Sequence, residues 1–204
     1  MLPKALQSFS MKSEDAGESI ASAAQIFSAA DVGAILRQRG WLQANEDAAH
    51  VPLPGEGRGQ ETDIWLGRAA LLLGPHAADR EALGRLLDHV FRYDASTLLR
   101  ESANQAVLAR TGAREVIRAL ANQVLESGEV DSEGYKRIIE TLKSALPYRG
   151  PALFFPIRMA LAGGVGDGAL DRVILLLDSA AKLPFRAPVK SARQRILEFC
   201  AALD

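Results

Sequence analysis

Apolar residues recur along most of this 204-residue chain at intervals of three and four positions. This spacing gathers apolar side chains on one side of an α-helix, whereas no segment sustains the alternation typical of a half-buried β-strand. The predicted fold class is therefore all-α, a helical bundle. The spacing predicts helices over residues 15–27, 31–40, 63–72, 79–90, 96–107, 113–125, 131–142, 156–163, 170–177 and 188–203.

Short polar residues and glycines mark where these helices are expected to begin and end. A side-chain oxygen at the start of a helix can accept a hydrogen bond from a free N–H group of the first turn. The predicted caps are Asp31, Asp63, Asp79, Ser96 and either Asp131 or Ser132. Gly40 suits the left-handed conformation that ends many helices. Residues 50–60, rich in proline and glycine, are predicted to form a linker or an exposed loop.

The segment 150–163 reads Gly-Pro-Ala-Leu-Phe-Phe-Pro-Ile-Arg-Met-Ala-Leu-Ala-Gly and carries the most specific pattern in the chain. Pro156 can open a helix, because its missing N–H would be unpaired in the first turn. Ile157, Ala160 and Leu161 then share one face, which we expect to be buried. Gly163 and Gly164 can end the helix in a left-handed conformation.

This segment resembles the signature near the end of bacterial glutamyl-tRNA synthetases, roughly Gly-Lys-x-Leu-Phe-x-Pro-Leu/Ile-Arg-x-Ala-Leu-Thr-Gly. Weaker similarity in 71–94 and 168–177 extends the resemblance over residues 65 to about 185. It implies a helical bundle like the anticodon-binding domain of those class I enzymes. Pro151 replaces the family's Lys and Ala162 its Thr, which removes two polar contacts and keeps the packing. The resemblance therefore implies the fold more strongly than RNA contact.

The catalytic half of such synthetases carries a His-x-Gly-His-type signature and a Lys-Met-Ser-Lys-Ser-type loop. None of the three histidines lies in such a setting, and we interpret residues 10–13, Ser-Met-Lys-Ser, as a polar lead-in to a helix. The glycine cluster 163–168 lacks Gly-Lys-Ser/Thr and is interpreted as an interhelical turn. No Cys/His set has zinc spacing. We expect no enzyme activity, no cofactor and no metal, and hence a free-standing relative of the anticodon-binding domain.

The resemblance divides the chain into three expected parts. Residues 1–60 form an unassigned helical segment with its linker. Residues 61–145 form a first anticodon-binding-like subdomain, and residues 146–204 form a C-terminal one.

Composition is that of a globular protein, with 48% hydrophobic and 24% charged residues. No apolar run reaches the ~18 residues of a membrane span. The first residues lack the apolar core of a secretory signal, and Cys200, the single cysteine, cannot form an internal disulfide. These features predict a cytoplasmic protein that does not associate with membranes.

The net charge of −1 is low for a nucleic-acid-binding protein, because phosphate neutralisation usually requires excess Lys and Arg. A local basic stripe without acids nevertheless lies between Asp178 and Glu198. It is either the solvated face of a terminal helix or a phosphate-binding surface. The candidate RNA-binding residues are Arg149, Arg158, Lys182, Arg186, Lys190, Arg193 and Arg195, with Tyr148 or Phe154 for base stacking; packing in the core is the preferred role of Phe154.

Three functions follow as hypotheses. The chain is a non-catalytic tRNA-binding module, with a glutamate-type tRNA as the candidate ligand; or a protein-interaction domain that kept the fold and lost RNA binding; or the tRNA-recognition piece of a split synthetase. The first is preferred. The near-neutral charge, Pro151 and Ala162 favour the second, whose partner would be a protein such as a synthetase. The sequence leaves the oligomeric state open.

Overall fold

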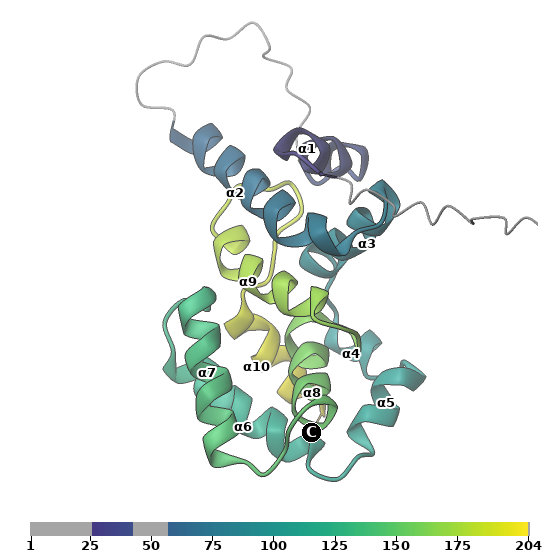
Figure 1. Ribbon diagram of the computed structural model, residues 1–204, viewed down its shortest axis with the longest axis vertical. Helices are drawn as coiled ribbons and strands as arrows, with labels where there is room; N and C mark the ends of the chain where they lie inside the picture. Colours follow the sequence, from purple (N-terminus) through teal and green to yellow (C-terminus); the bar gives the residue numbers. More distant parts are fainter. Residues whose placement is uncertain (1–25, 43–56, 204) are drawn as a thin grey trace, which may run out of the picture.

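A computed structural model describes residues 26–42 and 57–203 of the protein (Figure 1). Every regular element in these two ranges is helical, which confirms the all-α prediction. The helices are α1 (Ala29–Gln38), α2 (Gly57–Leu73), the 3-10 helix η1 (Gly74–His76), α3 (Arg80–Phe91), α4 (Ala95–Leu98), α5 (Ser102–Leu108), α6 (Ala113–Glu126), α7 (Ser132–Ala145), α8 (Pro151–Ala162), α9 (Ala169–Ala181) and α10 (Ala192–Leu203).

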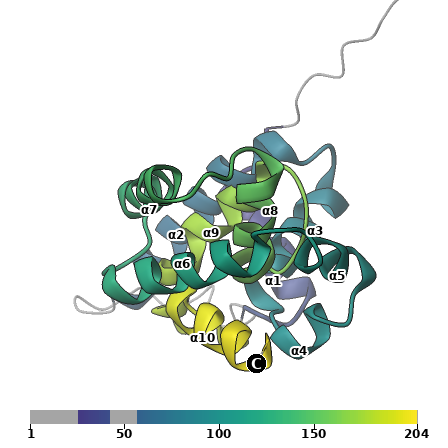
Figure 2. The same ribbon diagram turned by 90° about the horizontal axis from the view of Figure 1, so that it is seen from below.

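The helices lie in three groups. In Figure 1, α1, α2 and α3 form one end of the molecule, α5, α6 and α7 form the other, and α8, α9 and α10 lie between them. Helix α9 packs on α2 and α3, whereas α8 and α10 pack on α6. Buried apolar residues from Phe27 to Phe199 form one continuous core across all three groups. Figure 2 shows the end at which α6 and α10 lie side by side.

Helix α8 is buried over most of its length after its first two residues, because its apolar residues occur on several sides of the helix. Leu153, Ile157, Ala160 and Leu161 are all fully buried, so the expected burial of the signature segment is confirmed. The predicted start at Pro156 is wrong, since the helix already begins at Pro151. A proline inside a helix forfeits one backbone hydrogen bond and costs about 3 kcal/mol, a penalty that burial of the whole segment outweighs.

Other predicted boundaries also shift. Asp31 is not the cap of α1: Ser28 caps it, and the Asp31 carboxylate accepts a 2.8 Å hydrogen bond from the Ser28 N–H in a reciprocal capping box. Asp63 lies inside α2, which already begins at Gly57 within the expected linker. Asp79 does cap α3, with its carboxylate 2.7 Å from the Ala82 N–H.

Two further corrections concern helix length. The helix expected over 96–107 is divided into α4 and α5, and Asp94, not Ser96, caps the first. Helix α10 begins at Ala192, after the expected start at Pro188. Asp131 caps α7, as one of the two alternatives predicted. The helix expected at 15–27 and most of the expected linker lie outside the described residues.

An aromatic cluster joins the first group of helices to the loop after α9. Trp41 stacks on Phe91 with 4.6 Å between ring centroids, and Trp65 and Phe185 meet edge to face at 5.0 Å. The Trp65 indole N–H donates to the Leu176 carbonyl of α9 over 3.3 Å. No helix in the described ranges is long and apolar enough to cross a membrane.

Candidate nucleic-acid interface

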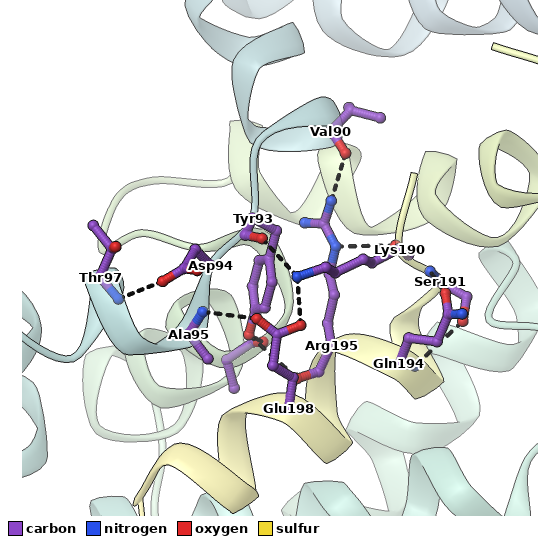
Figure 3. Close-up of polar contacts among 11 residues, drawn as sticks. Val90, Tyr93, Asp94, Ala95, Thr97, Lys190, Ser191, Gln194, Arg195 and Glu198 are labelled. Atoms are coloured by element: carbon purple, nitrogen blue, oxygen red, sulfur yellow. Dashed lines mark hydrogen bonds and ion pairs between the residues drawn. The ribbon is translucent and has the colours of Figure 1, made fainter. Parts of the chain in front are cut away.

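Arg195 is fully buried at the start of α10, where its guanidinium meets the C-terminal ends of two other helices (Figure 3). It donates to the His89 and Leu161 carbonyls over 2.9 Å each, and to the Val90 and Lys190 carbonyls. Burial lowers the pKa of Arg195 to about 10, so the group stays charged at neutral pH. The partly negative C-terminal ends of α3 and α8 stabilise this charge.

Arg195 therefore does not fit the role of phosphate contact that its position in the basic stripe suggested. A fully buried guanidinium whose donors are taken up by carbonyl groups cannot reach a ligand on the surface. Its ring neighbour is Tyr93, 4.6 Å from the guanidinium carbon to the ring centroid. The role of Arg195 is to hold α10 against α3 and α8.

Arg158 of the signature segment is also used within the fold. Its Nε and Nη2 bind both oxygens of Asp171 at 2.9 and 2.7 Å, and Nη1 donates to the Gly166 carbonyl over 2.7 Å. The hydroxyl of Tyr135 on α7 donates to the same carboxylate. The hydrogen bond to Asp171 raises the pKa of Arg158. With 12% of its side chain exposed, Arg158 mainly ties α8 to α9.

Arg149 and Tyr148 close the junction between α7 and α8. The Arg149 guanidinium is 2.6 Å from the Lys143 and Leu146 carbonyls and so caps the C-terminal end of α7, although the residue is exposed. The Tyr148 hydroxyl donates to Glu115 of α6 over 2.8 Å. That hydrogen bond raises the pKa of Tyr148. Its ring lies against Gly112, where an added Cβ would come within 2.1 Å, so one face of the ring is covered.

The remaining cations of the stripe point to different neighbours. Lys182 pairs with Glu129 and stays 66% exposed, while Lys190 binds the Tyr93 carbonyl and Glu198 (Figure 3). Arg193 is exposed and donates to the Leu125 carbonyl at the end of α6 over 2.9 Å. Arg186 is exposed in the loop after α9. The five residues follow one another without an intervening acid in the sequence, but Arg195 is buried and the other four differ in their partners and exposure.

Exposed arginines that sequence reasoning missed lie on α6. Arg114 and Arg118 stand one helical turn apart, and neither forms an ion pair within the described part of the chain. Arg110 precedes the helix and covers the ring of Phe155, 5.5 Å from guanidinium carbon to centroid. The four-residue spacing of these arginines, with one acid among them, was the available sequence signal.

One hollow among the described residues carries several ionisable side chains. It has a volume of about 520 Å³ and is lined by residues including Asp88, His89 and Glu101. His89 is hydrogen-bonded through Nδ1 to the Ala162 carbonyl at 3.0 Å, and burial lowers its pKa. No group of three or more His, Cys, Asp or Glu side chains in the described ranges could hold a metal ion.

The fold and the placement of the basic side chains define a class of protein: a helical protein with cations scattered over its surface. Over 120 residues the chain is 29% identical to glutamate–tRNA ligase 2 of Syntrophus aciditrophicus (strain SB). The match covers 55% of this chain and 23% of the ligase, so the chain spans about a quarter of the length of this relative. No family model matches the chain, and no solved structure matches it. The relationship to the synthetase is therefore distant and partial.

Proposed function

We propose that this protein is a non-catalytic tRNA-binding module similar to the anticodon-binding domain of glutamyl-tRNA synthetases. The observation that carries the proposal is the 120-residue similarity to a glutamate–tRNA ligase, in a chain whose regular elements are all helices in the described ranges. The match covers only 23% of the ligase, which is a small part of an enzyme that aminoacylates tRNA. Binding of tRNA therefore requires less of the ligase than aminoacylation does, and we favour it for the shared part. The proposed ligand is a glutamate-type tRNA.

The exposed cations are the proposed contacts. Arg149, Lys182, Arg186 and Arg193 keep solvent-accessible side chains and can approach a phosphate while holding their present partners. Lys190 is half-buried and would contribute mainly through its charge. Arg158 and Arg195 bind partners within the fold, and Tyr148 binds Glu115, so these three residues are not among the proposed direct contacts.

A titration of labelled glutamate-type tRNA by anisotropy tests the proposal. Affinity should fall steeply between about 50 and about 200 mM salt, because each phosphate contact releases counterions. No binding at the lower salt concentration would refute the proposal. The same protein should support no glutamate-dependent ATP–pyrophosphate exchange, and measurable exchange would refute the non-catalytic part.

A protein-interaction domain is the second candidate, favoured by two exposed apolar side chains on α2. Ile64 and Leu71 lie seven residues apart, on one face of the helix, and are 64% and 74% exposed. Exposed apolar side chains of this size mark many protein contacts when they form a patch.

The split-synthetase hypothesis has its own test. If a synthetase fragment recovers charging of tRNA when it is mixed with this chain, the chain is the missing piece of a split enzyme.

A further inference from the structure

Helices α6 and α10 run antiparallel and side by side. Arg193, near the start of α10, donates to the Leu125 carbonyl at the end of α6. Cys200 and Leu203, near the end of α10, line a hollow of about 200 Å³ together with Arg114 and Arg118 from the first half of α6. Arginines therefore occur at both ends of one seam between two helices, which we call the α6–α10 seam.

The arginines of this seam form no ion pair with the acids of α6 and α10 among the described residues. Glu115 binds the Tyr148 hydroxyl at the junction of α7 and α8, and Glu198 binds Lys190 and the Ala95 N–H. Glu126, the last residue of α6, forms no ion pair within the described residues. Apart from Glu126, the described acids of α6 and α10 are therefore held by other partners.

The arginine pair on α6 carries a cost in the free protein. Like charges four residues apart on a helix repel, which destabilises the helix by about 0.2–0.5 kcal/mol. The remaining lining of the hollow is apolar or neutral, with Asn122 beside Arg118. An anion placed between the two guanidinium groups would remove this repulsion and could accept hydrogen bonds from both.

We propose that the α6–α10 seam binds the phosphate backbone of an RNA helix through Arg114, Arg118 and Arg193. Arg114 and Arg118 stand about 6 Å apart along α6, and the bond of Arg193 to Leu125 places it about 10 Å further, at 1.5 Å of rise per residue. A row of guanidinium groups along a straight seam suits a repeating line of phosphates.

The neighbouring aromatic rings favour contact with the backbone over contact with bases. Phe155 is covered by Arg110, and Phe154 lies under Arg158 and Lys143. The rings beside this end of the bundle are therefore covered by cations, whereas base recognition in single strands relies on exposed aromatic faces. The inference rests on the proposed tRNA binding and specifies which surface performs it.

The test compares two neutralised pairs with the same loss of charge. Arg114→Gln with Arg118→Gln removes the row on α6, and Lys136→Gln with Arg137→Gln removes two exposed cations of α7. Glutamine keeps a helix propensity close to that of Arg and Lys, so both pairs should stay folded, which a thermal melt checks. Labelled glutamate-type tRNA and a short RNA duplex of unrelated sequence serve as probes.

The α6 pair should weaken binding of both probes at least about tenfold and reduce the salt slope by roughly two units, one for each phosphate contact. The α7 pair should change binding less than about twofold, as expected for charge outside the contact surface. Arg193→Gln should reduce the slope by about one further unit.

The inference and the proposed function fail in different ways. If the wild-type protein binds neither probe at about 50 mM salt, tRNA binding itself is refuted. If it binds and both pairs weaken it equally, or only Lys182 and Arg186 matter, the α6–α10 seam is refuted and tRNA binding stands. Competition by polyglutamate at charge concentrations equal to those of the duplex would assign the seam to an acidic protein partner instead.

Discussion

The arginines in the middle of the molecule and those on α6 use the same side chain in opposite ways. Arg158 and Arg195 direct their donors to a carboxylate and to carbonyl groups within the fold. Arg114 and Arg118 are exposed and have no ion-pair partner within the described ranges. Charge counted along a sequence therefore says little about charge presented to a ligand.

Removing Arg195 should give the largest effect on stability. Arg195→Met keeps most of the side-chain volume but leaves buried carbonyls at the ends of α3 and α8 without donors. We expect a loss of about 3–5 kcal/mol in the free energy of unfolding, measured by urea denaturation. Arg195→Lys keeps the charge but has fewer hydrogen-bond donors, so its free energy of unfolding should lie between those of the wild type and Arg195→Met. A loss below about 1 kcal/mol would contradict the structural role.

Removing Arg158 should lower the free energy of unfolding by less than removing Arg195, because the ion pair of Arg158 with Asp171 is partly exposed. Arg158→Ala leaves Asp171 with its hydrogen bond from the Tyr135 hydroxyl and removes the donor to the Gly166 carbonyl. We expect a loss of about 2–3 kcal/mol in unfolding free energy. Arg158→Lys should recover only part of it, since an ammonium cannot form the paired contact with both carboxylate oxygens. Full recovery by Lys would show that charge alone matters.

The sequence predicted well what depends on local spacing. The buried faces of α3, α6, α7 and α8 follow from apolar residues three and four positions apart, and Gly163 does end α8 with φ of +77°. The sequence was a poorer guide where two neighbouring residues can each cap the same helix. Ser28 and Asp31 are both acceptable caps, and only the reciprocal pair of hydrogen bonds decides between them.

The candidate site was the least predictable part, for a physical reason. Arg193 and Arg195 differ by two positions on α10, which is about 200° around a helix. One therefore faces solvent at the end of α6, and the other points into the core. A run of basic residues on a helix cannot all face one partner, whereas cations four apart, such as Arg114 and Arg118, can.

A third effect is a dependence of stability on pH through His89. Burial, and secondarily the nearby charge of Arg195, lower the pKa of His89 from its usual value near 6.5. The unfolded chain then takes up a proton below about pH 6.5 that the folded protein refuses, so stability falls as pH falls through this range and is retained above it. Urea denaturation near pH 7.5 and near pH 5.5 should show the difference. His89→Gln should reduce it, and an unchanged dependence would exclude His89 as the cause.

The smallest expected effect is on the stability of the α6 variant. Arg114→Gln with Arg118→Gln should change the free energy of unfolding by no more than about 0.5 kcal/mol, because both side chains are exposed and removing like charges offsets lost contacts. Thermal and chemical denaturation check this directly. A loss comparable to that of Arg158→Ala would show that α6 and the middle helices do not differ in how they use arginine.

The aromatic cluster has a spectroscopic consequence. The chain has two tryptophans, Trp41 and Trp65, and both belong to the cluster around Phe91 and Phe185. Intrinsic fluorescence therefore samples the end of the bundle formed by α1, α2 and α3, opposite to α6 (Figure 1). Emission should report the opening of that end during unfolding and stay nearly constant when a ligand occupies the α6–α10 seam, so an extrinsic label is needed to follow binding there.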